Sequence, residues 1–131
     1  MKYLLDTNAV IAILKGDAAV LARRLRTHAP GDFVLSAIVA HELFYGAYKS
    51  RDSAANLARL EKLQFAVVEF DHDDAREAGR VRAALAANGL PIGPYDVLIA
   101  GQALSRGLIL VTHNMREFGR VPGLLLEDWQ Q

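Results

Sequence analysis

Three acidic residues lie in stretches whose pattern predicts that they face the protein interior. Asp6 directly follows the apolar run at the start of "MKYLLDTNAVIAILKG", and a second apolar run begins three residues later. Glu42 lies on or beside the apolar stripe of the stretch 37–49, and Asp96 lies on the stripe of the stretch 94–106. Acids are rarely buried unless they are paired or bind a metal. These three residues therefore require a counter-charge.

The sequence indicates a divalent cation as that counter-charge. No Lys or Arg occurs three or four residues from Glu42 or Asp96, and two like charges ~4 Å apart in a protein-like dielectric repel by roughly 4 kcal/mol. A hard cation that prefers oxygen ligands, Mg²⁺ or Mn²⁺, resolves this conflict. Zinc fits less well because the chain has no cysteine and its four histidines form no HExxH pair. Taken alone, Asp6 is explained equally well as a helix N-cap, a role that Thr7 or Asn8 would also suit.

A fourth group of polar residues follows the apolar run "LILVT" in the segment "THNMREF". Thr112 and Asn114, together with Asn8, are predicted to orient the ligands, and Glu117 supplies another carboxylate. A helical turn starting near Asn114 would bring Glu117 back alongside that residue. Individually, these residues are explained equally well as parts of an ordinary surface turn.

Composition predicts one soluble domain over residues 1–131. The chain is 52% hydrophobic, has no cysteine, and carries fifteen basic and fifteen acidic residues, so net charge gives no sign of a nucleic-acid partner. Its longest apolar runs fall far short of the ~20 residues that span a bilayer. Asp6 and Asn8 interrupt the segment in which an export signal needs its apolar core. We therefore expect a cytoplasmic protein.

Short apolar runs alternate with helical patterns along the chain. The alternation predicts an α/β protein with a mainly parallel central sheet that is covered on both faces, in which ligands bind at the carboxyl ends of the strands. Asp71 with Asp74 resembles a helix cap. The expected strands are 2–5, 33–36, 65–70, 108–112 and 124–128, and the expected helices are 8–15, 18–27, 37–49, 53–63, 71–88 and 94–106.

Four segments carry a resemblance to a known family. "LLDTNAVIAIL", "AHELFYGAYKS", "PIGPYDVLIAGQAL" and "LVTHNMREFGRVPGLLLEDW" resemble the VapC toxin ribonucleases, which have a PIN domain. The likeness covers nearly the whole chain in the right order. It implies a three-layer α/β/α fold, Mg²⁺- or Mn²⁺-dependent RNA cleavage, a VapB-type antitoxin that lays a C-terminal segment over a groove at 42–65, and a homodimer. The tail is most similar to the branch that cleaves initiator tRNA.

The resemblance also assigns roles to individual residues. Asp6, Glu42 and Asp96 match the acidic centre, with Asp6 and Asp96 at the positions of direct metal ligands. Asn114 stands where Asp is common, which leaves the fourth acidic role open between Asn114 and Glu117. In the expected reaction, a water activated by the cation attacks a phosphodiester in line, and Glu42 orients that water or binds a second ion.

Basic and aromatic side chains near these segments are candidates for contacts with RNA. The tyrosines would either stack on unpaired bases or pack in the core or in an interface. The four histidines, His28, His41, His72 and His113, are expected at the surface. The basic candidates are Lys15, Lys49, Arg51, Arg116 and Arg120, and the aromatic candidates are Tyr45, Tyr48 and Tyr95.

Three other functions fit parts of the pattern. A haloacid-dehalogenase-like phosphatase also places an Asp after an apolar strand, but it needs a second Asp where Asn8 stands. A phosphoacceptor receiver domain needs an Asp after a later strand, which "FVLS" does not supply. A catalytically inactive PIN-like module that only binds a protein partner is disfavoured, because three inward-facing acids without a function would be costly.

Overall fold

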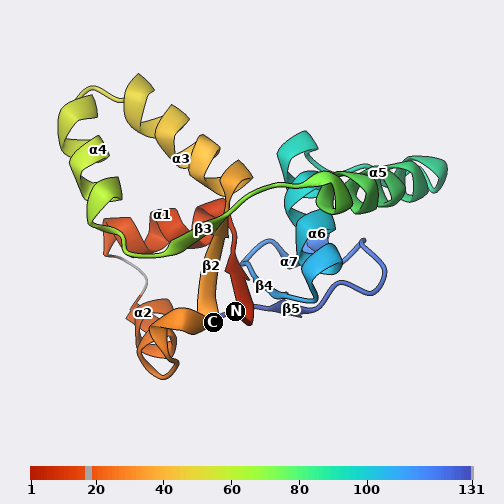
Figure 1. Ribbon diagram of the computed structural model, residues 1–131, viewed down its shortest axis with the longest axis horizontal. Coiled ribbons are helices and arrows are strands. Elements are labelled where there is room, and N and C mark those ends of the chain that lie inside the picture. The colour runs from red at the N-terminus through yellow and green to blue at the C-terminus, as the bar shows by residue number, and fades with distance from the viewer. Residues whose placement is uncertain (17–18, 131) are drawn as a thin grey trace.

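A five-stranded sheet forms the centre of the protein (Figure 1). The structure is a computed structural model that describes residues 1–16 and 19–130. The strands run in the order β3-β2-β1-β4-β5, and all four pairings between neighbours are parallel. They are β1 (Tyr3–Leu5), β2 (Phe33–Ser36), β3 (Ala66–Val68), β4 (Ile109–Val111) and β5 (Leu126–Glu127). The sheet confirms the predicted α/β class.

The strand order changes direction beside β1. From β1 the chain builds outward through β2 to β3, and then returns to the other side of β1 for β4 and β5. In open parallel sheets, ligands bind outside the carboxyl ends of the strands at such a switch point. Here those ends belong to β1 and β4, where Leu5 pairs with Val111. The topology thus directs attention to the residues that follow these two strands.

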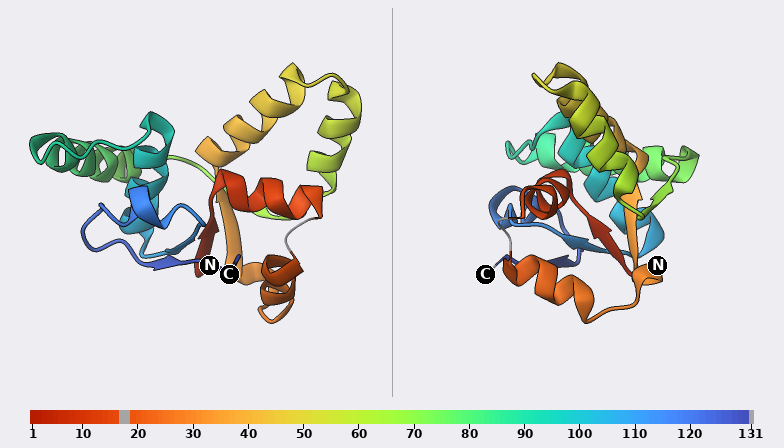
Figure 2. Two further views of the ribbon diagram at one scale, coloured as in Figure 1. Left: turned by 180° about the vertical axis from the view of Figure 1, so that it is seen from behind. Right: turned by 90° about the vertical axis from the view of Figure 1, so that its left-hand side faces the viewer.

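Helices flank the sheet. In Figure 1, α3 and α4 lie on one side of the strands, and α5 and α6 lie on the other. Figure 1 and Figure 2 both show α2 near the N-terminus. None of the described helices is long and apolar enough to cross a membrane. The helices are α1 (Thr7–Lys15), α2 (Ala19–Arg26), α3 (Ala37–Lys49), α4 (Ser53–Lys62), α5 (His72–Ala87), α6 (Pro94–Arg106) and the short α7 (Met115–Phe118).

The predicted elements agree with the observed ones to within two residues at each described end. The predicted start of the second helix at Ala18 lies outside the described residues. At α5, Asp71 Oδ1 accepts from the Asp74 backbone N–H at 3.0 Å, and Asp74 Oδ2 accepts from the Asp71 backbone N–H at 2.9 Å. This reciprocal pair is a capping box, which confirms the predicted cap.

Helices α5 and α6 approach each other closely at Gly101. A Cβ atom at Gly101 would lie 2.4 Å from the Cα of Ala78, far inside van der Waals contact. The two helices are also joined by polar contacts, because Gln102 and Arg106 both donate to Asp74 Oδ2, at 3.1 Å each. Asp74 is fully buried. Small residues and a buried polar network therefore fix α6, which carries Asp96.

An aromatic cluster at the amino end of the sheet anchors the C-terminal tail. Trp129 is fully buried, its ring is stacked on His28 with centroids 5.1 Å apart, and Tyr3 and Phe33 pack edge-on against it. The expectation that His28 lies at the surface is wrong, because His28 is half-buried in this cluster. The tail returns to the start of the chain here, which the local sequence around His28 does not indicate.

Candidate active site

Asp6 lies at the switch point of the sheet and makes two kinds of contact. Its Oδ1 accepts from the backbone N–H of Ala9 at 2.8 Å, so Asp6 is the N-cap of α1. Its Oδ2 accepts from the Thr112 hydroxyl, directly after β4, at 2.6 Å. Burial raises the pKa of Asp6, the hydrogen bonds from Thr112 and Ala9 oppose that rise, and the charges of Glu42 and Asp128 add to it. Capping therefore does not exclude a second role for this carboxylate.

Asp96 lies in the first turn of α6 and is half-buried. Burial raises its pKa to about 6, and the negative charges of Glu42, Glu117 and Asp6 raise it as well. A helix N-terminus favours the charged form of a carboxylate, so the rise in the pKa of Asp96 comes from burial and from the neighbouring acids rather than from the helix. The structure thus brings Asp96 within electrostatic reach of the other three predicted acids.

Glu42 is half-buried on α3 and is held by a residue that the sequence reasoning did not select. The Thr7 hydroxyl donates to Glu42 Oε1 at 2.8 Å. Asn8, which was predicted to orient ligands, is exposed, and no hydrogen bond of its side chain is found within the described part of the chain. Thr7 rather than Asn8 therefore contacts a predicted site residue. Its position as the first residue of α1, directly after Asp6, was the available signal.

The segment after β4 connects Asp6 to Glu117. The Thr112 hydroxyl that donates to Asp6 also accepts from the backbone N–H of Asn114 at 2.9 Å. Asn114 caps α7, the predicted helical turn, and its Nδ2 donates to Glu117 Oε2 at 3.2 Å. Thr112 therefore orients Asp6, and Asn114 orients Glu117.

Asp128 is an additional acid that the sequence reasoning did not select. It follows β5, its charge raises the pKa of Asp6, and its side chain is only 9% exposed. Asp128 Oδ2 lies 2.9 Å from Nδ1 of His113, a histidine that is exposed as expected. Glu127 separates Asp128 from the apolar run 124–126, whereas Asp6 directly follows its run. The rule that selected Asp6 therefore points to Glu127, and Asp128 joins the acids through the position of β5 beside β4.

The residues present suit a hard divalent cation with an open coordination sphere. In the described residues, no group of three acids or histidines is close enough to enclose a metal, and no Lys or Arg forms a salt bridge with the four predicted acids. A Cβ at Gly93 would lie 3.1 Å from Asp96 Oδ2, so this glycine leaves space beside the carboxylate. Mg²⁺ typically keeps several waters and binds one or two carboxylates. An all-oxygen donor set of this kind fits Mg²⁺ better than zinc, whose protein sites are built mainly from Cys and His.

The basic residues predicted to contact RNA lie at the surface. Lys15, Lys49, Arg51 and Arg116 are exposed. Arg120 is half-buried, and its Nη1 donates to the Pro91 carbonyl at 3.0 Å. Exposure leaves the first four residues free for contacts with RNA, which stay a prediction, whereas Arg120 already holds the tail to the loop before α6.

Comparisons with known proteins identify the family to which this chain is similar. The family model of the PIN domain matches residues 3–124. The tRNA(fMet)-specific endonucleases VapC of Salmonella typhimurium and Shigella flexneri are 42% and 44% identical to this chain over 131 residues, covering 98% of each chain. The crystal structure of DNA-bound VapBC from Salmonella typhimurium contains a chain that is 42% identical and superposes with a TM-score of 0.94, covering 98% of both chains.

These matches also decide between the families considered above. A phosphatase of the haloacid-dehalogenase type and a receiver domain are both excluded as the family, since the match to the PIN domain spans nearly the whole chain. The relatives at 42% and 44% identity over almost their full length are VapC proteins, which narrows the family from PIN domains in general to VapC. The chain belongs to the PIN domain family and, within it, to the VapC proteins.

Proposed function

We propose that this protein is a metal-dependent endoribonuclease and the toxin of a toxin–antitoxin pair. The observation that carries the proposal is the convergence of Asp6, Glu42, Asp96 and Glu117 at the switch point of the sheet, with no salt bridge to a basic residue in the described chain. The relatives from Salmonella typhimurium and Shigella flexneri are named tRNA(fMet)-specific endonucleases. We therefore propose initiator tRNA as the substrate and the cytoplasm as the place of action.

In the proposed reaction, Asp6 and Asp96 hold Mg²⁺, or Mn²⁺ in its place. When bound, the divalent cation supplies the positive charge that acidifies water and neutralises the phosphoryl oxygens. Thr112 keeps the Asp6 carboxylate in one orientation through the 2.6 Å hydrogen bond. Glu42, held through one oxygen by Thr7, has its other oxygen available to accept a proton from the attacking water. Positioning of this kind contributes to the rate because the reacting groups need no further ordering.

The test of this function uses purified protein and RNA. We expect wild-type protein with Mg²⁺ to cleave initiator tRNA, as seen by sequencing of the RNA ends, and Asp6→Asn to be inactive. Asn retains the cap on Ala9 because its side-chain oxygen still accepts, so loss of activity without a fall in the melting temperature points to the site. Millimolar Mg²⁺ should raise the melting temperature of the wild type, since a ligand that binds only the folded state stabilises it. Asp6→Asn that cleaves at the wild-type rate would refute the metal assignment.

A groove beside the acids suits the antitoxin. It has a volume of about 280 Å³ and lies between α1, α3 and α4, in the region predicted from the sequence. Its wall includes Glu42, so a segment bound there would lie beside the acids and block RNA. The structurally similar Salmonella chain comes from a VapBC complex. The groove is lined by Ile11, Leu14, Lys15, Glu42, Leu43, Gly46, Ala47, Asn56, Arg59 and Leu60.

The antitoxin assignment has a direct test at Gly46. A Cβ there meets no atom within 4 Å, so Gly46→Leu should fill the groove without disturbing the fold. We expect this variant to cleave RNA but to escape inhibition by the small protein encoded in the adjacent reading frame. A variant that is inhibited like the wild type would move the antitoxin to another surface. We also propose a homodimer, and a monomer at micromolar concentration in sedimentation experiments would disprove it.

A binding module without catalysis is the second candidate. A wild-type protein that binds the antitoxin but cleaves no RNA at any Mg²⁺ or Mn²⁺ concentration would favour it. The repulsion that raises the pKa of Asp96 argues against a binding module without catalysis. This repulsion lowers the stability of the fold, and a surface that only binds a partner gains nothing from it.

A further inference from the structure

Exposed aromatic side chains gather on α3 and at the start of α6. Tyr45, Tyr48 and Tyr95 are 61%, 68% and 46% exposed, and His41 is exposed as well. These exposures exclude the core for the three tyrosines, whereas the alternative that they pack in an interface stays a prediction. We call His41, Tyr45, Tyr48 and Tyr95 the aromatic stripe. Large apolar side chains that stay exposed in a cluster mark a surface that binds something.

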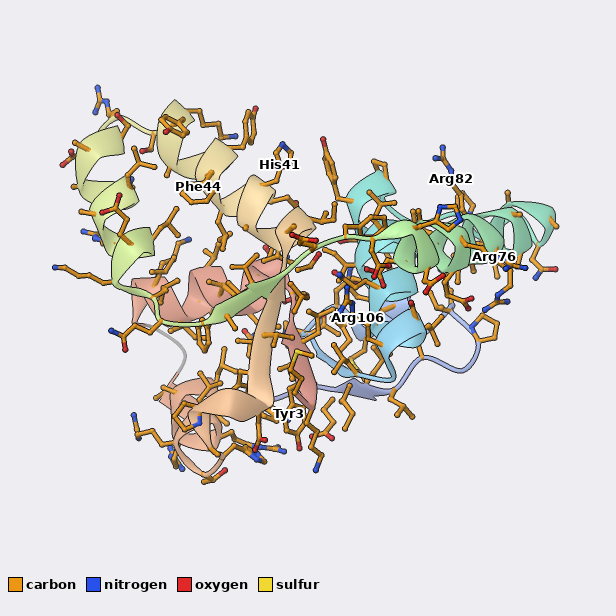
Figure 3. The ribbon with its side chains drawn as sticks, viewed as in Figure 1. Tyr3, His41, Phe44, Arg76, Arg82 and Arg106 are labelled. Atoms are coloured by element: carbon orange, nitrogen blue, oxygen red, sulfur yellow. The ribbon has the colours of Figure 1, made fainter. Side chains whose placement is uncertain are left out.

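The stripe begins directly beside the acids. His41 precedes Glu42 on α3 and Tyr95 precedes Asp96 on α6. The rings of His41 and Tyr95 contact each other with centroids 5.4 Å apart and planes tilted by 48°. Figure 3 shows His41 projecting from α3 on the side toward the first turn of α6. Because the rings are tilted rather than parallel, His41 supports the Tyr95 ring and leaves part of it open.

A cationic side chain follows the aromatic side chains along the same face of α3. His41, Tyr45 and Lys49 are spaced by four residues, which places them on neighbouring turns of one helix face. The Lys49 Nζ lies 4.9 Å from the centroid of the Tyr45 ring. Stacking surfaces combined with positive charge are how proteins hold single-stranded nucleic acid, because bases stack on the rings and cations contact the phosphates.

We propose that the Tyr95 ring, supported by His41, stacks on an unpaired base next to the scissile phosphate, and that Tyr45 and Lys49 continue the path of the strand. The inference rests on the proposed ribonuclease function and adds the residues that select unpaired RNA. Bases within a duplex keep their faces covered and cannot stack on a side chain. The alternative occupant of the aromatic stripe is a second copy of this chain. We favour RNA because the four residues of the stripe include no acid, and because Lys49 beside Tyr45 supplies a positive charge for the phosphates.

The test measures RNA binding in protein that does not cleave. Fluorescence anisotropy with Asp6→Asn as the parent compares a short unpaired oligonucleotide with the same sequence in a duplex. Adding Tyr95→Ala should weaken binding of the unpaired strand about tenfold, which is typical for the loss of one stacked base, and should change duplex binding less than twofold. Adding Tyr95→Phe, which keeps the ring, should restore the parent affinity.

Phe44 provides a matched control. It is on α3 and 46% exposed like Tyr95, but it lines a different hollow together with Leu60 and Phe65. Phe44→Ala should bind both RNAs like the parent. A Tyr95→Ala protein that also binds like the parent overturns the inference while leaving the ribonuclease function standing, provided that the wild type cleaves RNA.

Two further results would overturn the inference. Equal loss of unpaired and duplex binding together with conversion of a dimer to a monomer, seen by sedimentation, would assign the stripe to contacts between copies. A wild-type protein that cleaves no RNA would remove the proposed function and this inference with it.

Discussion

The acids of the candidate site repel one another in the metal-free protein. Burial and the charges of Glu42, Glu117 and Asp6 raise the pKa of Asp96 to about 6, and the pKa of Asp6 is raised as well. A raised pKa means that the folded protein holds the proton more tightly than the unfolded chain does. The site residues therefore reduce the stability of the metal-free fold at neutral pH, and a bound cation would reverse this effect.

The first prediction concerns the pH dependence of stability. Because the pKa of Asp96 is about 6 in the folded state and has an ordinary value of 3.8, the folded state binds more protons between these values. Metal-free wild type should therefore lose stability as the pH rises from about 4 to 6. Asp96→Asn cannot ionise and lacks this loss, so above pH 6 it should be more stable by about 1 kcal/mol, allowing for solvent screening at a half-exposed group.

Urea unfolding of both proteins in EDTA across this range measures the difference. Acids that do not interact with Asp96 titrate equally in the two proteins, so they cancel in the comparison. Removing the Asp96 charge also relieves its repulsion of Glu42, Glu117 and Asp6, which acts in the same direction. A stability difference that does not change between pH 4 and 7 would contradict the prediction. With Mg²⁺ present, Asp96→Asn should cleave no RNA at any pH.

A second prediction separates Glu117 from the metal ligands. Glu117→Gln keeps an oxygen that can accept from Asn114 Nδ2 but loses the charge. We expect cleavage to fall roughly 10–100-fold, as for groups that act on a metal through a neighbour, and less than for Asp6→Asn. The Mg²⁺ dependence of the cleavage rate is the measurement. A Glu117→Gln protein with wild-type kinetics would make Glu117 an ordinary surface acid.

At the level of elements, the position of Asp96 depends on how closely α5 and α6 pack. Gly101 is the contact, since a Cβ there would lie 2.4 Å from the Ala78 Cα. Backbone atoms cannot rotate away as a side chain does, so one methyl group must push the helices apart. Asp96 lies five residues before Gly101 on the same helix. It would therefore move with α6 relative to Asp6, which follows β1, and to Glu42 on α3.

The third prediction follows from that packing. Gly101→Ala should destabilise the protein by roughly 1–3 kcal/mol, the usual cost of an overpacked core. Gly79→Ala on α5 is the control, because a Cβ there meets nothing within 4 Å, and it should stabilise by roughly 0.5–1 kcal/mol through the helix preference of Ala over Gly. Thermal unfolding of both variants tests the pair. Equal changes in stability from the two substitutions would show that the contact between α5 and α6 does not fix the position of α6.

The elements themselves were predictable from the sequence because their signals are local. Each of these signals lies within a few residues of the element that it predicts. Examples are the spacing of apolar residues, the Asp71–Asp74 cap of α5 and Gly107 at the end of α6. The contacts between elements were harder to predict. Thr7 reaches Glu42 across 35 residues, and Asp128 joins the acids only because β5 lies beside β4. Such pairs depend on strand order and helix rotation, which no single segment encodes.

The whole molecule is closed by its C-terminal tail. Trp129 is fully buried against Tyr3, His28 and Phe33, at the end of the sheet opposite the acids. The Arg24 guanidinium also lies 4.9 Å from the centroid of the Trp129 ring. The last strand and the residues after it thus join the first strand and α2.

The fourth prediction tests this closure. Trp129→Ala should destabilise the protein by roughly 3–5 kcal/mol, as for other buried aromatic truncations. Leu125→Ala in the same tail, where the side chain is 58% exposed, should change stability by less than about 0.5 kcal/mol. Urea unfolding gives both values. A Trp129→Ala protein as stable as Leu125→Ala would show that the aromatic cluster contributes little.

The strand order also has a consequence for synthesis of the protein on the ribosome. Asp6 and Glu42 emerge early, whereas Asp96, Thr112 and Glu117 emerge in the last third of the chain, and β1 pairs with β4 between residues more than a hundred positions apart, such as Leu4 and Leu110. A domain generally folds as a unit. Until β4 and the segment after it leave the exit tunnel, the sheet is incomplete and the acids cannot assemble. For the proposed ribonuclease, a nascent chain that lacks this segment therefore has no assembled site, and activity begins only after β4 and Glu117 have emerged.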